Sequence, residues 1–106
     1  MKKYFSELIG TFLMVFIGTG SVVINSLHNN IGQIGVGISF GIAVALSIFL
    51  FAKFSGAHIN PAVSVALFFK DKLNSKELIG YVMFQLIGAI LASLSLKVLF
   101  PLDKSS

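Results

Sequence analysis

Residues 55–64, which read SGAHINPAVS, place a histidine, an asparagine and a proline in one of the most apolar parts of the sequence. Polar groups are costly in an apolar environment unless they are hydrogen-bonded, so these residues require an explanation. Gly56 permits a tight backbone bend. Asn60 is a favoured N-cap residue, and Pro61 suits the first position of a helix, where its missing N–H costs nothing. This order of residues predicts a bend followed by the start of a helix.

The composition around this stretch is typical of a membrane protein. The 106 residues are 56% apolar and 11% charged, and their mean hydropathy is +0.93, which lies outside the range usual for soluble globular domains. Three windows without charge, at 8–27, 31–52 and 78–96, are long enough to cross a hydrocarbon core of about 30 Å. We expect a single unit, 1–106, with three spans at about 7–27, 32–54 and 76–98.

The first window also has a signal peptide as an alternative reading, because Lys2 and Lys3 precede an apolar run. The run is longer than the apolar region of most signal peptides, and no small-residue cleavage site follows it. A mature transmembrane helix is therefore the favoured interpretation.

Residues 55–70 are too few to cross the membrane and return as two full helices. They fit a re-entrant segment that enters as extended chain and leaves as a short helix ending near Lys70. Non-helical backbone at membrane depth persists only where it is buried in protein or lines a water-filled cavity. Residues predicted to line a polar path are Gly56, Ala57, His58, Ile59 and Asn60. The positive end of the half-helix would repel cations there, while a neutral solute could be hydrogen-bonded.

The lysines predict the orientation of the chain. Six of them, Lys2, Lys3, Lys53, Lys70, Lys72 and Lys76, fall on one side of the predicted spans, and Lys97 and Lys104 fall on the other. Positive residues are enriched on the cytoplasmic side. We therefore expect a multi-pass protein of the cell membrane with its N-terminus inside and its C-terminus outside.

Several functional classes receive little support from the sequence. There are no cysteines, which excludes disulfides and thiolate metal sites. No histidine cluster has the spacing of metal ligands, and no cofactor is expected. Ser64 has no matching base and acid within sequence reach, so catalysis is not expected. The lysines are dispersed around the spans, which argues against nucleic-acid binding.

The segment SGAHINPAVS resembles the first signature loop of the aquaporin and glycerol-facilitator family, the major intrinsic proteins. The surroundings agree, since SELIGTFLMVFIGTGS (6–21) is similar to the first helix of that family and YVMFQLIGAILAS (81–93) to its third. The resemblance implies an all-α membrane protein in which three transmembrane helices and one re-entrant half-helix form the first inverted repeat. It further implies a passive channel for water or small neutral solutes.

The resemblance also assigns roles to individual residues. Asn60 would donate its side-chain amide to a passing solute, and Pro61 and Ala62 would pack against the tip of an opposing half-helix. His58 and the preceding carbonyls would line the inner vestibule. Glu7 would accept backbone N–H groups of the loop. Alternatives stay open: His58 fits a hydrogen-bonded buried histidine, and Glu7 fits the headgroup region beside the first lysines.

Other residues in the spans have assignments as well. Phe40 falls where the family has one aromatic wall of its outer constriction, and phenylalanine there is similar to the water-selective members; it also fits an ordinary lipid-facing or core-facing position. Gln85 is predicted to make an interhelical hydrogen bond. Gly37, Gly41 and Gly88 are predicted to permit close helix packing.

The sequence departs from the family pattern in length. Family members have six spans and a second half-helix followed by an arginine, whereas this sequence has three predicted spans and no arginine. One hypothesis is a channel half that needs a complementary second half or a homo-oligomer, with water preferred over glycerol as the solute. The other is a truncated, nonconducting membrane protein or assembly partner.

Overall fold

Four helices make up the part of the chain that the structure, a computed structural model, describes, which is residues 1–101. They are α1 (Lys2–His28), α2 (Gly32–Ser55), α3 (Pro61–Phe69) and α4 (Ser75–Leu99). No strand occurs within those residues. Helices α1, α2 and α4 are each long and apolar enough to cross a membrane. The prediction of three spans is confirmed, although α1 begins at Lys2, before the expected start at residue 7.

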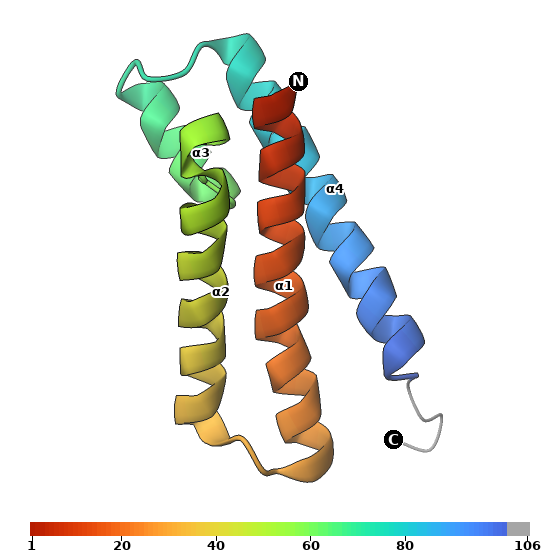
Figure 1. The fold of residues 1–106 in the computed structure, drawn as a ribbon. Helices are drawn as coiled ribbons and strands as arrows, with labels where there is room; N and C mark the ends of the chain where they lie inside the picture. The colour runs from red at the N-terminus through yellow and green to blue at the C-terminus, as the bar shows by residue number, and fades with distance from the viewer. Residues whose placement is uncertain (102–106) are drawn as a thin grey trace.

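Helix α1 occupies the centre of the arrangement, with α2 on one side of it and α4 on the other, as Figure 1 shows. Close packing of α4 against α1 depends on Gly88. A Cβ at this position would collide with the backbone of α1 at Leu8 and Phe12. On the other side of α1, Ser47 of α2 donates a hydrogen bond to the carbonyl of Gly10 at 3.2 Å. Small residues thus set the distances between the three spans.

The two other predicted packing glycines have no such neighbour within the chain. Gly37 and Gly41 lie on an exposed face of α2, and a Cβ added to either would meet no atom within 4 Å. No helix of the described residues packs closely there, and the expectation of close packing at Gly37 and Gly41 stays a prediction. Of the three glycines, Gly88 is the one with a close backbone neighbour among the described residues. The sequence does not distinguish a covered face of a helix from an open one.

Helix α3 is too short to cross a membrane, since nine residues extend about 14 Å. It packs against α4. Figure 1 shows that it returns toward the end of the bundle that holds the N-terminus. The chain between α2 and α3, residues 56–60, is not helical. This is the re-entrant geometry predicted from the sequence.

The same end of the bundle carries most of the lysines. The N-terminus, the end of α2, the end of α3 and the start of α4 meet there (Figure 1), which brings six lysines to one side. Lys97 lies in the last turn of α4 at the opposite end. Lys104, which the sequence places with Lys97, is outside the described residues.

Candidate functional site

The loop between α2 and α3 binds the backbone N–H groups of residues 56–59 inside the protein. The N–H of Gly56 donates to the carbonyl of Ala52 at 2.7 Å, and that of Ala57 donates to Ser55 Oγ at 3.1 Å. The N–H groups of His58 and Ile59 both donate to Glu7, at 3.0 and 2.8 Å. Every N–H of residues 56–59 is therefore satisfied inside the chain.

The carbonyls of the same four residues behave in the opposite way. None of them accepts a hydrogen bond from a described residue. A buried peptide carbonyl without a partner costs free energy unless water or a ligand reaches it. The loop therefore presents a run of four hydrogen-bond acceptors that the described part of the chain leaves free.

This separation of donors and acceptors follows from unusual backbone angles. Gly56 has φ 84°, and two residues other than glycine, Ala57 and Ile59, have φ 50° and 49°. The left-handed region costs an L-residue about 1–2 kcal/mol, and such strain persists only where the surroundings enforce it. The glycine could be predicted from the sequence, whereas nothing in the residue types of Ala57 or Ile59 marks them.

Glu7 holds the loop in this conformation by accepting its N–H groups. Its carboxyl group is fully buried and accepts four hydrogen bonds. Oε1 accepts from the N–H of Ile59 at 2.8 Å and from Gln85 Nε2 at 2.7 Å. Oε2 accepts from the N–H of His58 at 3.0 Å and from Ser55 Oγ at 2.6 Å. The alternative position beside the lysines of the headgroup region is excluded, because the carboxyl group of Glu7 lies inside the bundle.

Two further side chains, Tyr81 and Ser55, fix the start of the loop, and the sequence alone did not predict either contact. Tyr81 on α4 donates from its hydroxyl to the carbonyl of Ser55 at 2.6 Å. The Tyr81 ring also packs on the His58 ring, with centroids 4.6 Å apart. Ser55 in turn joins Glu7 to the N–H of Ala57. A serine before a bend and a tyrosine on another helix carry no signal of this arrangement.

Asn60 caps α3 as its position before Pro61 predicts. Its Oδ1 accepts the N–H of Ala62 at 2.7 Å, which places the amide nitrogen, Nδ2, on the other side of the group. Asn60 is exposed, as is Ala62, while Pro61 is half-buried. The Nδ2 donor of Asn60 makes no hydrogen bond to a described residue. It is free at the N-terminal end of the half-helix, next to the unpaired carbonyls.

Ser64 lies one turn into α3 and is fully buried. Its Oγ is 2.9 Å from His58 Nδ1 and accepts a hydrogen bond from Gln85 Nε2 at 2.9 Å. The sequence predicts no base and acid matched to Ser64, and the structure brings one such group, the His58 ring, within hydrogen-bond distance of it. The arrangement is not that of an activated nucleophile. Glu7 binds the backbone of His58 and not its ring, and Ser64 has no access to a substrate.

Phe40 lies on α2, away from the loop. Its half-buried ring covers Gly18 of α1, where an added Cβ would collide with the ring. The structure therefore places Phe40 at the contact between α1 and α2, and its predicted role at an outer constriction stays a prediction.

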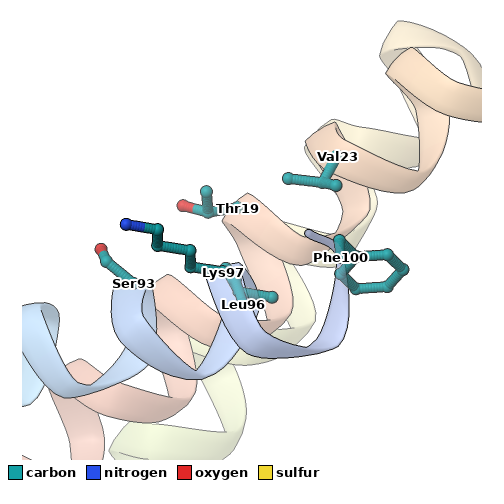
Figure 2. Close-up of a pocket in the computed structure, with 6 residues that line it drawn as sticks. All are labelled: Thr19, Val23, Ser93, Leu96, Lys97 and Phe100. Carbon is teal, nitrogen blue, oxygen red and sulfur yellow. The ribbon is translucent and has the colours of Figure 1, made fainter. Parts of the chain in front are cut away.

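A hollow at the opposite end of the molecule from α3 lies between α1 and α4 (Figure 2). Its volume is about 280 Å³. The residues that line it are Thr19, Val23, Ser93, Leu96, Lys97 and Phe100. None of them belongs to the loop or to its hydrogen-bond network, so this hollow is separate from the candidate site.

Comparison with known proteins identifies the family. The family model described as "Major intrinsic protein" matches residues 1–105. The chain belongs to the major intrinsic protein family. The resemblance of the loop, of the first helix and of the third helix to this family is thereby confirmed, and so is the all-α membrane fold.

Individual members of the family are similar over most of the chain. "Glycerol uptake facilitator protein-like 6" of Lactiplantibacillus plantarum is 41% identical over 92% of this chain and 43% of its own length. Aquaporin Z of Photorhabdus laumondii is 40% identical over 93% of this chain and 44% of its own length. The X-ray structure of the aquaglyceroporin from Plasmodium falciparum superposes with a TM-score of 0.83 at 31% identity, covering 93% of this chain and 41% of that chain. The chain thus spans less than half the length of each of these major intrinsic proteins.

Proposed function

We propose that the chain forms half of a passive transmembrane channel for water or small neutral solutes. The observation that carries this proposal is the loop of residues 56–59, in which every N–H is bound inside the protein and no described residue donates to any of the carbonyls. Such a row of acceptors can replace the hydrogen bonds that a solute loses when it leaves bulk water. Membership of the major intrinsic protein family supports the same function.

A hydrogen-bond donor, the side-chain amide of Asn60, follows the free carbonyls in the proposed path. Asn60 offers its Nδ2 at the start of α3, where the N-terminal end of the helix has positive partial charge. A neutral solute can accept from Asn60 and donate to the carbonyls, whereas a cation is repelled by the helix end. The carboxyl oxygens of Glu7 are not part of this path, because the side chain is fully buried and four donors inside the protein bind it.

We further propose that the path is complete only with a partner. The N-terminal end of α3 contacts no second half-helix within the described residues, and the apolar residues Val63 and Phe69 of α3 are 42% and 77% exposed. A complementary second half of the family fold would cover these surfaces, as would further copies of the chain. By itself the chain is expected not to conduct. The alternative is a truncated, nonconducting membrane protein or assembly partner, which would not conduct with a second half either. No enzymatic activity is proposed.

Water is the first choice of solute and glycerol the second. The similar proteins do not decide between them, since one is named as a glycerol facilitator and another as an aquaporin at nearly equal identity. Phe40 favours water, because phenylalanine at this position is similar to the water-selective members of the family. This choice depends on the proposed role of Phe40.

Stopped-flow light scattering from proteoliposomes tests the proposal. The chain alone should leave osmotic water permeability at the level of empty liposomes. Joined to the part of Photorhabdus aquaporin Z that follows the matched region, it should raise that permeability severalfold. A glycerol gradient applied to the same vesicles determines the solute preference.

Asn60→Asp in the joined protein is the matched variant. Aspartate caps a helix as well as asparagine does, so α3 should persist, but the Nδ2 donor is lost and a negative charge is added. Water permeability should fall by at least about tenfold, the factor for one lost interaction of about 1.4 kcal/mol. A joined protein that inserts and folds but never conducts would rule the proposal out.

A further inference from the structure

We infer that Ser64 is a positioning residue that holds His58 as the neutral tautomer with its proton on Nε2, so that His58 offers a hydrogen-bond donor to the path. The inference follows from the direction of each hydrogen bond in a chain of four side chains. These are Glu7, Gln85, Ser64 and His58.

Glu7 determines which groups donate and which accept in this chain of hydrogen bonds. Backbone N–H groups of two loop residues, which can only donate, bind both of its oxygens. The Ser55 hydroxyl and the Gln85 amide donate to the same two oxygens, so the carboxyl group accepts from all four partners. Gln85 meets Oε1 at 2.7 Å, so it must present its NH₂ there and not its carbonyl oxygen. This fixes the orientation of the Gln85 amide.

The next hydrogen bonds in the chain, from Gln85 to Ser64 and from Ser64 to His58, have the corresponding donors and acceptors. The NH₂ of Gln85 has a second hydrogen, which is donated to Ser64 Oγ at 2.9 Å. The Ser64 hydroxyl still has its own hydrogen to donate, and the side chain is fully buried. Among the described residues its other partner is His58 Nδ1, at 2.9 Å. If Nδ1 carried a proton, the hydroxyl hydrogen would have no acceptor, and a buried unpaired donor costs about 1–3 kcal/mol.

His58 Nδ1 is therefore the acceptor, and in a neutral ring the proton lies on Nε2. Nε2 makes no hydrogen bond to a described residue. It is also not sealed inside the protein: the enclosed side-chain nitrogen and oxygen atoms without a partner in residues 1–101 are Thr11 Oγ1 and Gln85 Oε1. Nε2 thus keeps access to the space beside the loop.

This tautomer determines what His58 can offer to a solute in the proposed path. A bare imidazole nitrogen is a base and a metal ligand, whereas Nε2–H is neither. With its lone pair directed into the protein toward Ser64, His58 can orient a neutral solute by donating to it, and it cannot pick up a passing proton at Nε2. This role in passage rests on the proposed function, but the tautomer itself does not.

Nitrogen NMR of the full chain in lipid bilayers tests the inference. The protein is labelled with ¹⁵N-histidine and carries His28→Asn, so that His58 is its one remaining histidine. A protonated and a bare ring nitrogen have well-separated frequencies, so the tautomer can be read directly near neutral pH. We expect Nε2–H to exceed Nδ1–H by about tenfold or more, since an unpaired buried hydroxyl opposes the second form.

Two variants separate positioning from simple packing. Ser64→Thr keeps the hydroxyl and should keep the Nε2–H form, whereas Ser64→Ala should yield a mixture of both tautomers. Dominance of Nδ1–H in the parent protein would overturn the inference, and that result needs no variant. An unchanged tautomer in a folded Ser64→Ala protein would overturn the role of Ser64. Because the readout requires no conduction, its outcome is independent of the permeability measurements.

Discussion

A single carboxylate determines the shape of the re-entrant loop. Glu7 gathers two backbone N–H groups, a serine hydroxyl and a glutamine amide onto two oxygen atoms. The left-handed angles at Ala57 and Ile59 are what bring the N–H groups of the loop to one side. Ile59 is held from its side chain as well, which is 4% exposed and lies against Gly10. The same backbone angles that bring the N–H groups of the loop to Glu7 therefore also turn its carbonyls away from the described residues.

Glu7→Gln should destabilise the protein strongly. The substituted amide offers an NH₂ to donors that previously met an oxygen, so two hydrogen bonds are lost and buried donors are left unpaired. We expect the free energy of unfolding to fall by about 3 kcal/mol, measured by reversible denaturation in mixed micelles. Glu77→Gln is the control, since Glu77 is a partly exposed carboxylate that binds Lys3 at 2.7 Å. Equal losses in the two variants would contradict the central role of Glu7.

At the scale of elements, some helix faces are in close contact with a neighbouring helix and others have no neighbour within the described residues. The face of α4 at Gly88 is in backbone contact with α1, and the face of α2 at Gly37 and Gly41 is open. Backbone atoms cannot move aside as a flexible side chain can, so the first contact is intolerant of any added atom. The second face has room for a side chain within this chain.

Gly88→Ala and Gly41→Ala form a matched pair that tests this difference. The first should push α4 away from α1 and reduce the free energy of unfolding by about 2 kcal/mol, within the range for overpacked sites. The second should leave stability unchanged, because a new Cβ there meets no atom of the chain. Both are measured by the same denaturation assay. A large loss for Gly41→Ala would indicate that another chain covers that face of α2.

Much of the element level could be predicted from sequence. Charge-free length predicted the spans, and the order Gly56, Asn60, Pro61 predicted the bend and the capped half-helix. These features are local, and each residue type has its own conformational preference. The hydrogen bonds of Ser64 and Tyr81 could not be predicted in this way, because they join residues from different helices. The role of Glu7 came from family resemblance, since a lone glutamate near two lysines fits the headgroup region equally well.

The positively charged residues of the molecule are concentrated at one end. The end that holds the N-terminus, the α2–α3 connection and the start of α4 carries six lysines, and the described part of the other end carries Lys97. Positive charge is retained on the cytoplasmic side. We therefore propose that the crowded end faces the cytoplasm and that the loop between α1 and α2 faces outside.

The absence of cysteine from the sequence makes this orientation simple to test. Asn30→Cys in the outer loop should react with a membrane-impermeant maleimide added to intact cells. Asp71→Cys, between α3 and α4, should react only after the cells are opened. Labelling of both positions from outside to equal extents would show dual insertion and would make an antiparallel pair of chains possible.

The position of Glu7 so early in the chain has a consequence for biosynthesis. Its donors are synthesised 48 to 78 residues later, the last of them on α4. A bare carboxylate is expensive in lipid, so α1 cannot simply leave the translocon as soon as it is complete. The carboxyl group of Glu7 must keep hydrogen bonds to water until α2, the loop and α4 have emerged. The three spans are therefore expected to enter the bilayer as one group, and not one after another.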